Sequence, residues 1–291
     1  TWGAESTFPV RMKAGAIAQE LFRKLPNHPG AAHYIIHAFD DPIHAPLALT
    51  AADRYAEIAP DVSHALHMPS HIFIQRGMWA KVVASNEASY QAALAKWQRR
   101  DNSSETQRYF TDVYVWHALD WGQYGALQQK DWTKAKQAID RLRPVAEKST
   151  VPIVKEGIGE MTARYIVESE QWQQLPLTSK LTSHELMATG LNAVRMGDVA
   201  IAQQAEEKLK NMEQERRPAR PKRRQQALTI MRLEIAALVR VAQGQSGAAI
   251  ALMDEAVAIA ERIGLPNGAA IPIKPAHEVY GEILLELDRP K

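Results

Sequence analysis

The chain has 291 residues, no cysteine, and 35 Lys+Arg against 33 Asp+Glu. Without cysteine there is no disulfide, thiolate metal ligand or cysteine nucleophile. A net charge of +2 offers no basic surface of the kind that nucleic-acid binding requires, so no nucleic-acid partner is expected. No run of 18 apolar residues is present, which predicts no membrane span. The compartment stays open between cytoplasm and export, because an N-terminal signal can have been removed before Thr1.

Helical periodicity dominates from the beginning of the chain. Ile17, Leu21 and Leu25 are four residues apart and predict the apolar face of a first helix that ends before Pro26. Pro29 is well placed to begin the next helix, because proline is favoured at the first helical position. No alternating strand pattern stands out, so we expect an all-α fold.

A short turn recurs four times. In its ideal form a glycine ends one helix in the left-handed conformation and an aromatic or apolar residue begins an alanine-rich second helix. The copies are Gly77-Met78-Trp79, Lys130-Asp131-Trp132, Gly197-Asp198-Val199 and Gly244-Gln245-Ser246. Repeated helical hairpins predict a right-handed α-α superhelix, a tetratricopeptide-like (TPR-like) solenoid over residues 1–291. The copies are 53, 67 and 47 residues apart, more than the usual period of about 34, so longer or additional helices are expected.

A basic, proline-containing segment at about residues 213–224 interrupts the helical pattern. We interpret this segment as a solvated linker between helices. The alternative is a contact for an anionic partner.

Seven of the ten histidines fall between residues 28 and 71. His33 and His37 are spaced i,i+4, as are His67 and His71, so each pair shares a helix face. His64 precedes His71 by seven residues and lies on the same face. If the two helices are neighbours, roughly 8–10 Å apart on the concave wall of a solenoid, these five imidazoles can form a metal site. A polar ligand groove and ordinary structural packing are the alternatives.

The surrounding residues suggest how such a site is supported. Ser63 is a candidate cap for a helix that begins near His64 and His67, where the positive end of the helix dipole disfavours imidazolium. Carboxylates close in sequence are candidates for orienting or ligating groups: Asp40, Asp41 and Asp61. Further candidates for supporting or ligand-binding roles are His28, Tyr34, His44, His117 with Asp120 beside it, and His277.

The chemistry of the ligands limits the metal. A nitrogen-rich set without thiolates suits Zn, Cu, Ni or Fe. Neither His33 nor His67 is followed by glutamate, so thermolysin-like chemistry is not expected. No glycine-rich phosphate loop or serine-centred elbow is present, and no organic cofactor is indicated.

Two strings carry a resemblance to a known group of proteins. They are HPGAAHYIIHAFDDP from His28 and HALHMPSHIF from His64. Both resemble motifs of a family of bacterial tetratricopeptide-like proteins, and weaker similarity around His117, Arg164 and Lys274 extends over nearly the whole chain. The resemblance implies a helical-hairpin solenoid, a chain that is usually longer at both ends, and frequent export. It implies no particular activity.

Three functions follow as hypotheses. The favoured one is a binding or scaffold protein that takes a peptide, a protein or a small ligand in its concave groove, with a bound metal shaping the site. The second is a metal-dependent hydrolase or oxidoreductase that uses the same histidines with an open coordination position. The third is a structural unit that self-associates through its uncapped ends.

Overall fold

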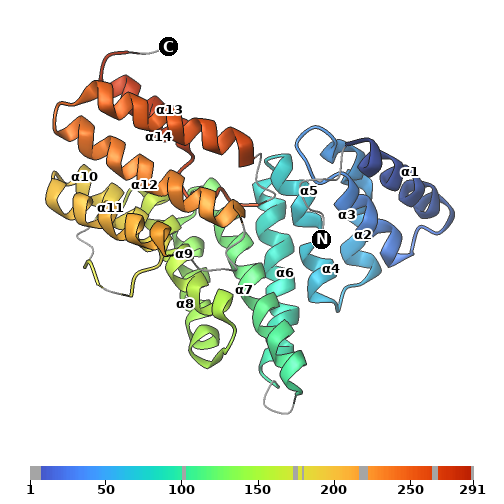
Figure 1. The fold of residues 1–291 in the computed structure, drawn as a ribbon. Coiled ribbons are helices and arrows are strands. Elements are labelled where there is room, and N and C mark those ends of the chain that lie inside the picture. Colours follow the sequence, from blue (N-terminus) through green and yellow to red (C-terminus); the bar gives the residue numbers. More distant parts are fainter. Residues whose placement is uncertain are drawn as a thin grey trace. The chain divides into compact units, whose positions relative to one another are not determined.

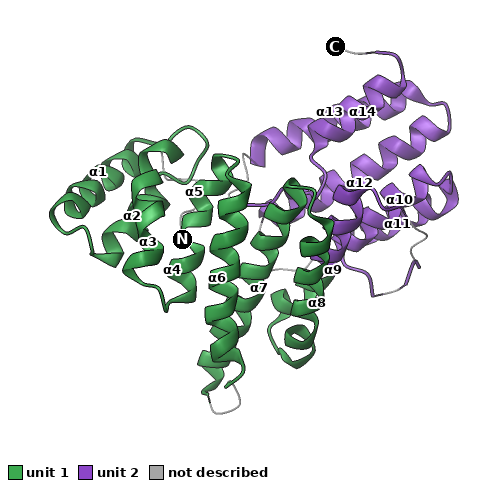
Figure 2. Cartoon of the chain, turned by 180° about the vertical axis from the view of Figure 1, so that it is seen from behind, with its two compact units in different colours: residues 1–158 green, residues 159–291 purple. Residues whose placement is uncertain are grey.

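α-Helices form the computed structural model, which describes residues 8–99, 103–172, 176–178, 180–215, 222–263 and 268–289 (Figure 1). The all-α prediction is confirmed, since these residues contain no strand. The chain divides into two compact units, residues 1–158 and 159–291 (Figure 2). No helix within the described ranges has the length and apolar character that crossing a membrane requires.

Unit 1 holds the histidine-rich segment. Its elements are α1 (Phe8–Lys24), α2 (Pro29–Ala38), η1 (Ala45–Ala48), α3 (Leu49–Ile58), α4 (Ser63–His67), α5 (Pro69–Gln75), α6 (Trp79–Trp97), α7 (Glu105–Gln128) and α8 (Trp132–Lys148). Helix α1 packs on α2, α4 and α5 on α6, α6 on α7, and α7 on α8. Helix α9 (Pro152–Ser169) contains the division between the units.

Unit 2 consists of further helical hairpins. Its further elements are α10 (Ser183–Arg195), α11 (Val199–Gln214), α12 (Lys222–Ala242), α13 (Ser246–Ile263) and α14 (Ala276–Glu286). Helix α10 packs on α11, and α12 packs on α11, α13 and α14.

All four recurrent turns have the expected geometry. Gly77, Gly197 and Gly244 have φ of 63°, 77° and 73°, and Lys130 adopts φ of 57° without being glycine. In each turn the next amide reaches back to a carbonyl five residues earlier, as Met78 does to Phe73 at 2.9 Å. This is the Schellman arrangement, which satisfies the last carbonyls of a helix. The hairpin turns are therefore confirmed at these positions.

The uneven spacing of the turns also has a structural reason. Helix α7 has 24 residues, and the longest interval, between Lys130 and Gly197, contains the additional helix α9. The predicted basic linker is shorter than residues 213–224, because α11 continues to Gln214 and α12 begins at Lys222. Residues 216–221 lie outside the described residues.

The apolar face predicted for the first helix is not buried. Ile17, Leu21 and Leu25 are 63%, 38% and 51% exposed, whereas Gly15 and Ala18 face inward. The close approach of α1 and α2 explains this choice, because a Cβ on Gly15 would overlap the ring of Phe39. Small residues therefore form the contact, and the large apolar side chains stay outside it.

A buried core lies directly behind the histidine-bearing helices. It includes Ile36 from α2, Met68 between α4 and α5, Ile72 from α5 and Val82 from α6. Each of these side chains is fully buried. Because closely packed interiors resist movement, the core holds the backbones of α2, α4 and α5 in place.

Candidate metal centre

Helix α2 presents two histidines on one face. Pro29 begins the helix at its first position, and the His28 Nδ1 caps it by accepting from the Ala31 amide at 3.2 Å. One turn apart, His33 and His37 lie half-buried beside the inward-facing residues of the helix. The rigid start and buried back of α2 thus fix the direction of both imidazoles.

Helices α4 and α5 bring three more histidines to the same place. Pro69 cannot donate a helical hydrogen bond, and α4 accordingly ends at His67 and α5 begins at Pro69. The Ser63 side chain does not cap α4, contrary to the expectation. Its hydroxyl instead bonds the Ser89 hydroxyl at 3.0 Å, and Val62 occupies the cap position. With only five residues in α4 and His67 at its end, the proposed helix-dipole effect does not apply.

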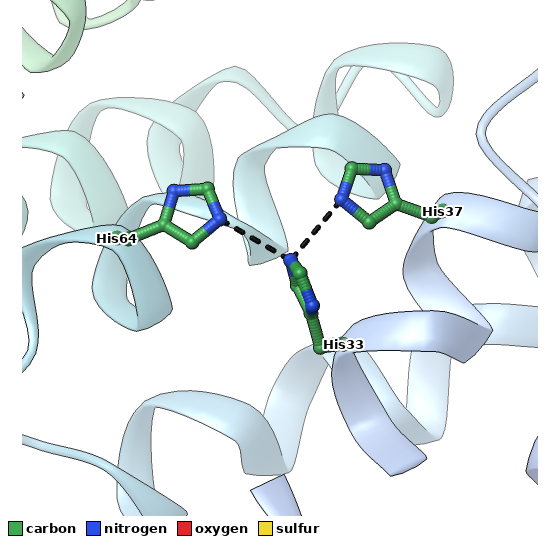
Figure 3. Close-up of side chains that lie close together, drawn as sticks. All are labelled: His33, His37 and His64. Atoms are coloured by element: carbon green, nitrogen blue, oxygen red, sulfur yellow. Dashed lines mark hydrogen bonds between the residues drawn. The ribbon is translucent and has the colours of Figure 1, made fainter. Parts of the chain in front are cut away.

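The first group of ligand atoms combines α2 and α4, and we call it the outer triad: His33, His37 and His64. The Nε2 of His33 lies 3.2 Å from that of His64 and 3.1 Å from that of His37 (Figure 3). The three rings point toward one another from their helices. All three side chains are only partly buried.

The second group, the inner triad, comprises His67, His71 and His117. The Nε2 atoms of His67 and His71 are 3.2 Å apart, and the His117 ring lies 4.2 Å from the His67 ring between centroids. His117 comes from α7, far along the chain. Trp121, one turn further on α7, packs on this triad with its ring 4.5 Å from that of His71.

Each triad has dimensions that fit a metal ion. Its possible ligand atoms all lie within 4.8 Å of one another. Two nitrogens bound to one tetrahedral zinc ion at about 2.0–2.1 Å are separated by about 3.3 Å, close to the 3.1–3.2 Å observed here. Two histidine triads that can hold a metal ion therefore lie in unit 1. The five histidines expected to form one site are divided between them.

Asn86 determines the protonation of His67. The amide of Asn86 donates through Nδ2 to the Val82 carbonyl at 2.8 Å, which turns its Oδ1 toward His67 Nδ1 at 2.7 Å. Because an amide oxygen only accepts, His67 Nδ1 is the donor. In the neutral imidazole, His67 Nε2 then carries a lone pair that points at His71.

Asp40 likewise makes Nδ1 the hydrogen-bond donor of His71. Its buried carboxylate accepts from His71 Nδ1 at 2.8 Å and from Gln75 Nε2 at 3.3 Å. When the His71 ring is neutral, its Nε2 therefore also carries a lone pair. In this state the two lone pairs face each other across 3.2 Å, and neither nitrogen can donate to the other. This contact is repulsive unless a cation lies between them.

Burial favours the neutral form of five of the six triad histidines. Desolvation lowers the pKa of His37 and His64 to about 4 and that of His117 to about 3, and the charges of neighbouring imidazoles lower each pKa further. The pKa of His33 is lowered, and that of the fully buried His67 lies well below its usual range, for the same reasons. Neutral imidazole is the form that binds metal.

Other predicted residues lie around the triads. His28 is an exposed helix cap, and His44 bonds Asp41 at 2.9 Å, which in turn pairs with Arg11 at 3.2 Å. These contacts give all three side chains structural roles. The remaining supporting candidates are also placed. Tyr34 is exposed with its ring 5.7 Å from that of His33, Asp61 is exposed, and Asp120 is buried on α7.

His277 is the candidate that unit 2 contains. Its side chain is 61% exposed, and its Nε2 lies 3.7 Å from a Glu261 oxygen. It therefore belongs to a surface pair within unit 2, while both triads are in unit 1.

Sequence reasoning missed two residues of the site. His117 was expected in a supporting or ligand-binding role, and its nitrogen is among the possible ligands. Asn86 and Trp121 were not singled out, because neither stands in a histidine-rich string. The i,i+4 relation between His117 and Trp121 is a sequence signal that could have pointed to α7.

Comparison with known proteins adds no family assignment. No protein-family model and no curated protein matches the chain.

Proposed function

We propose that this chain is a TPR-like binding protein whose histidine cluster holds a transition-metal ion. The repeated hairpins with Schellman turns support the TPR-like part of the proposal. The resemblance of the histidine strings to bacterial tetratricopeptide-like proteins agrees with it. The solenoid arrangement itself is part of the proposal.

The observation that carries the metal proposal is the contact between His67 and His71. Asn86 and Asp40 hold the outer proton of each ring, and both Nε2 lone pairs face inward at 3.2 Å. A single proton shared by the two nitrogens would also relieve the repulsion, but burial of His67 opposes a charge on that ring. A metal ion removes the repulsion and uses both lone pairs as ligands.

Support from surrounding residues is typical of metal sites. A histidine ligand usually donates its second ring nitrogen to a carboxylate or carbonyl oxygen, which orients the ring and raises its basicity. Asp40 and Asn86 provide such acceptors to His71 and His67. Zn, Cu, Ni and Fe are all compatible with imidazole nitrogen.

A metal-dependent enzyme is the second candidate, and one observation favours it. Each triad supplies three protein ligands, and three ligands with one remaining position is the pattern of catalytic zinc rather than of structural zinc. By analogy, the fold class favours the binding role, because helical-hairpin proteins mainly present surfaces. In this role a concave groove of the proposed solenoid takes a peptide, a protein or a small ligand.

The test is the metal content of protein purified without a polyhistidine tag. We expect bound transition metal by inductively coupled plasma mass spectrometry, with a lower metal content in the double variant His67→Ala/His71→Ala, which removes two inner-triad ligands. His277→Ala in unit 2 is the matched control and retains the metal. Circular dichroism and urea unfolding show whether each variant is folded. Folded wild-type protein that takes up neither Zn²⁺ nor Cu²⁺ on addition would refute the proposal.

A further inference from the structure

We infer that the two triads form one two-metal centre, in which a small anion bridges an inner and an outer ion. The inference rests on the proposed metal-binding function and extends it. It follows from how the triads are linked, how they differ in exposure, and what charge they bring.

The ligand nitrogens gather in two groups of three among the described residues, not in one group of six. One octahedral ion would need all six nitrogens within about 4.2 Å of one another, twice the usual metal–nitrogen bond length of about 2.1 Å. Two ions, one for each triad, fit the grouping better.

The two triads are nevertheless close. Between triads, the rings of His37 and His71 are 6.1 Å apart and those of His64 and His67 are 6.5 Å apart. Within triads, the rings whose Nε2 atoms lie 3.1–3.2 Å apart have centroids separated by 4.6–5.2 Å. The separation between triads is only slightly longer, which places the two ions in the range where one ligand can touch both. Known two-metal sites have their ions about 3.5–4 Å apart.

Helix α4 ties the triads together. His64 belongs to the outer triad and His67, three residues later on the same short helix, to the inner one. Two serines of α6 anchor α4. Ser89 donates a hydrogen bond to the Ser63 carbonyl at the start of α4, at 2.8 Å, and Ser85 donates one to the Leu66 carbonyl near the end of α4. The spacing between the two ions is therefore fixed by a rigid element and does not depend on a mobile loop.

The triads differ in access to solvent. In the inner triad His67 is only 2% exposed, and Trp121 packs on its rings. In the outer triad all three histidines are partly exposed, and the exposed Tyr34 lies beside His33. An exchangeable ligand can thus enter from the outer side, while the inner ion is shielded.

The charge of the ligand set selects an anion. All six possible ligands are imidazoles, which bring no negative charge, so two divalent ions keep their full charge apart from the Asp40 carboxylate that orients His71. Asp41, the neighbouring carboxylate, is already paired with Arg11. Bound cations dominate the local field, and each ion has a position that no protein ligand fills. A small anion such as hydroxide, carboxylate or phosphate is the ligand that this arrangement favours.

The experiment uses Cu²⁺ as the probe, because its unpaired electron reports a neighbouring ion. We expect the tag-free chain to bind two Cu²⁺ and the doubly loaded protein to give an electron paramagnetic resonance signal well below two spins, owing to magnetic coupling. His64→Ala and His117→Ala each break one triad, and each retains one Cu²⁺ with a full one-spin signal. His37→Gln and His71→Gln replace them if either alanine variant fails to fold, and His277→Ala is the control that keeps the coupled pair.

Azide then tests the bridging anion. We expect azide to bind the doubly loaded protein at least ten-fold more tightly than either single-triad variant. Two fully uncoupled spins, a single bound Cu²⁺, or equal azide affinity in all three proteins would overturn the two-metal inference. Those outcomes leave a metal-binding protein intact. Absence of any bound metal would instead refute the proposed function.

Discussion

The Asp40 carboxylate, just beyond the end of α2, accepts a hydrogen bond from His71 Nδ1 on α5 at 2.8 Å. This contact joins the two histidine-rich strings and directs the opposite nitrogen of His71 into the inner triad. Because the carboxylate is buried, its removal changes the ring's basicity and orientation together.

Asp40→Asn tests this relationship. The amide keeps the size of the side chain but removes the negative charge, so we expect about 10–100-fold weaker metal binding. Competition against a chromophoric chelator measures the change. Asp53→Asn is the matched control, because Asp53 forms only an exposed pair with Lys81. Equal metal affinity in Asp40→Asn and wild type would show that His71 needs no carboxylate.

Asn86→Leu tests the fixed protonation of His67. The substitution removes the acceptor of a buried Nδ1–H and the donor to the Val82 carbonyl. We expect the metal-free protein to lose about 1–3 kcal/mol in unfolding free energy, the usual cost of a buried polar group without a partner. Gln91→Leu on the exposed side of the same helix is the control. If urea unfolding shows the same loss of unfolding free energy in both variants, the loss comes from a general weakening of α6 and not from the contact with His67.

The neutral histidines make metal-free protein sensitive to acid. Their pKa values are about 4 for His37 and His64 and about 3 for His117 in the folded state, below the ordinary value of 6.5. The unfolded chain therefore binds more protons than the folded chain between pH 6.5 and these folded pKa values, and stability falls as pH falls through that window. Each such histidine contributes up to about 1.4 kcal/mol per pH unit in that window.

Urea unfolding in the presence of EDTA between pH 7.5 and pH 4.5 measures this slope. We expect a shallower slope in His117→Leu than in wild type, since one titrating ring is gone. His277→Leu, which removes a surface ring, serves as the comparison. A wild-type stability that is constant over this range would contradict the assigned burial of the cluster.

Glu234 produces the opposite pH dependence in unit 2. Its side chain is fully buried on α12, and neither carboxyl oxygen has a hydrogen-bond partner among the described residues. Desolvation raises its pKa well above the usual range, Lys274 opposes the rise and Glu278 adds to it. Folding therefore takes up a proton above pH 4.5, and stability declines as pH rises through the folded pKa.

Glu234→Met removes both the titration and the unpaired polar atoms. We expect unfolding free energy at pH 7 to rise by about 1–3 kcal/mol, with a smaller gain at pH 5. Glu255→Gln, an exposed change on α13, is the control. Destabilisation by Glu234→Met at pH 7 would mean that this carboxyl has a stabilising partner.

The hairpin turns predict opposite changes in stability for two substitutions. Gly197 has φ of 77° and open space around its Cβ position, so Gly197→Ala is expected to cost about 1–2 kcal/mol through backbone strain alone. Lys130 already adopts φ of 57°, and Lys130→Gly is expected to stabilise the protein by relieving that strain. Thermal unfolding of both variants measures these changes in stability. A loss of stability in Lys130→Gly would contradict the turn assignment.

Local patterns in the sequence predicted much of this structure. The i,i+4 spacing of His33 with His37 and of His67 with His71, together with Pro69, was enough to indicate converging imidazoles. The turns at Gly77, Gly197 and Gly244 were readable because a left-handed residue leaves a local signature. These are contacts whose partners lie within one or two helical turns.

Long-range contacts could not be read in this way. His117 and Asn86 reach the inner triad through the packing of α7 and α4 on α6, which no short motif encodes. The division into two triads likewise depends on which helices are neighbours in space. Ser63 failed as a cap because tertiary packing gave its hydroxyl a different partner, Ser89.

The most direct test is an X-ray structure of tag-free protein loaded with Zn²⁺, with anomalous data at the zinc edge. The account places a peak about 2.0–2.1 Å from Nε2 of His67 and His71, on the side facing His117. Anomalous density at surface histidines alone, with the two inner nitrogens still unliganded at full loading, would contradict it.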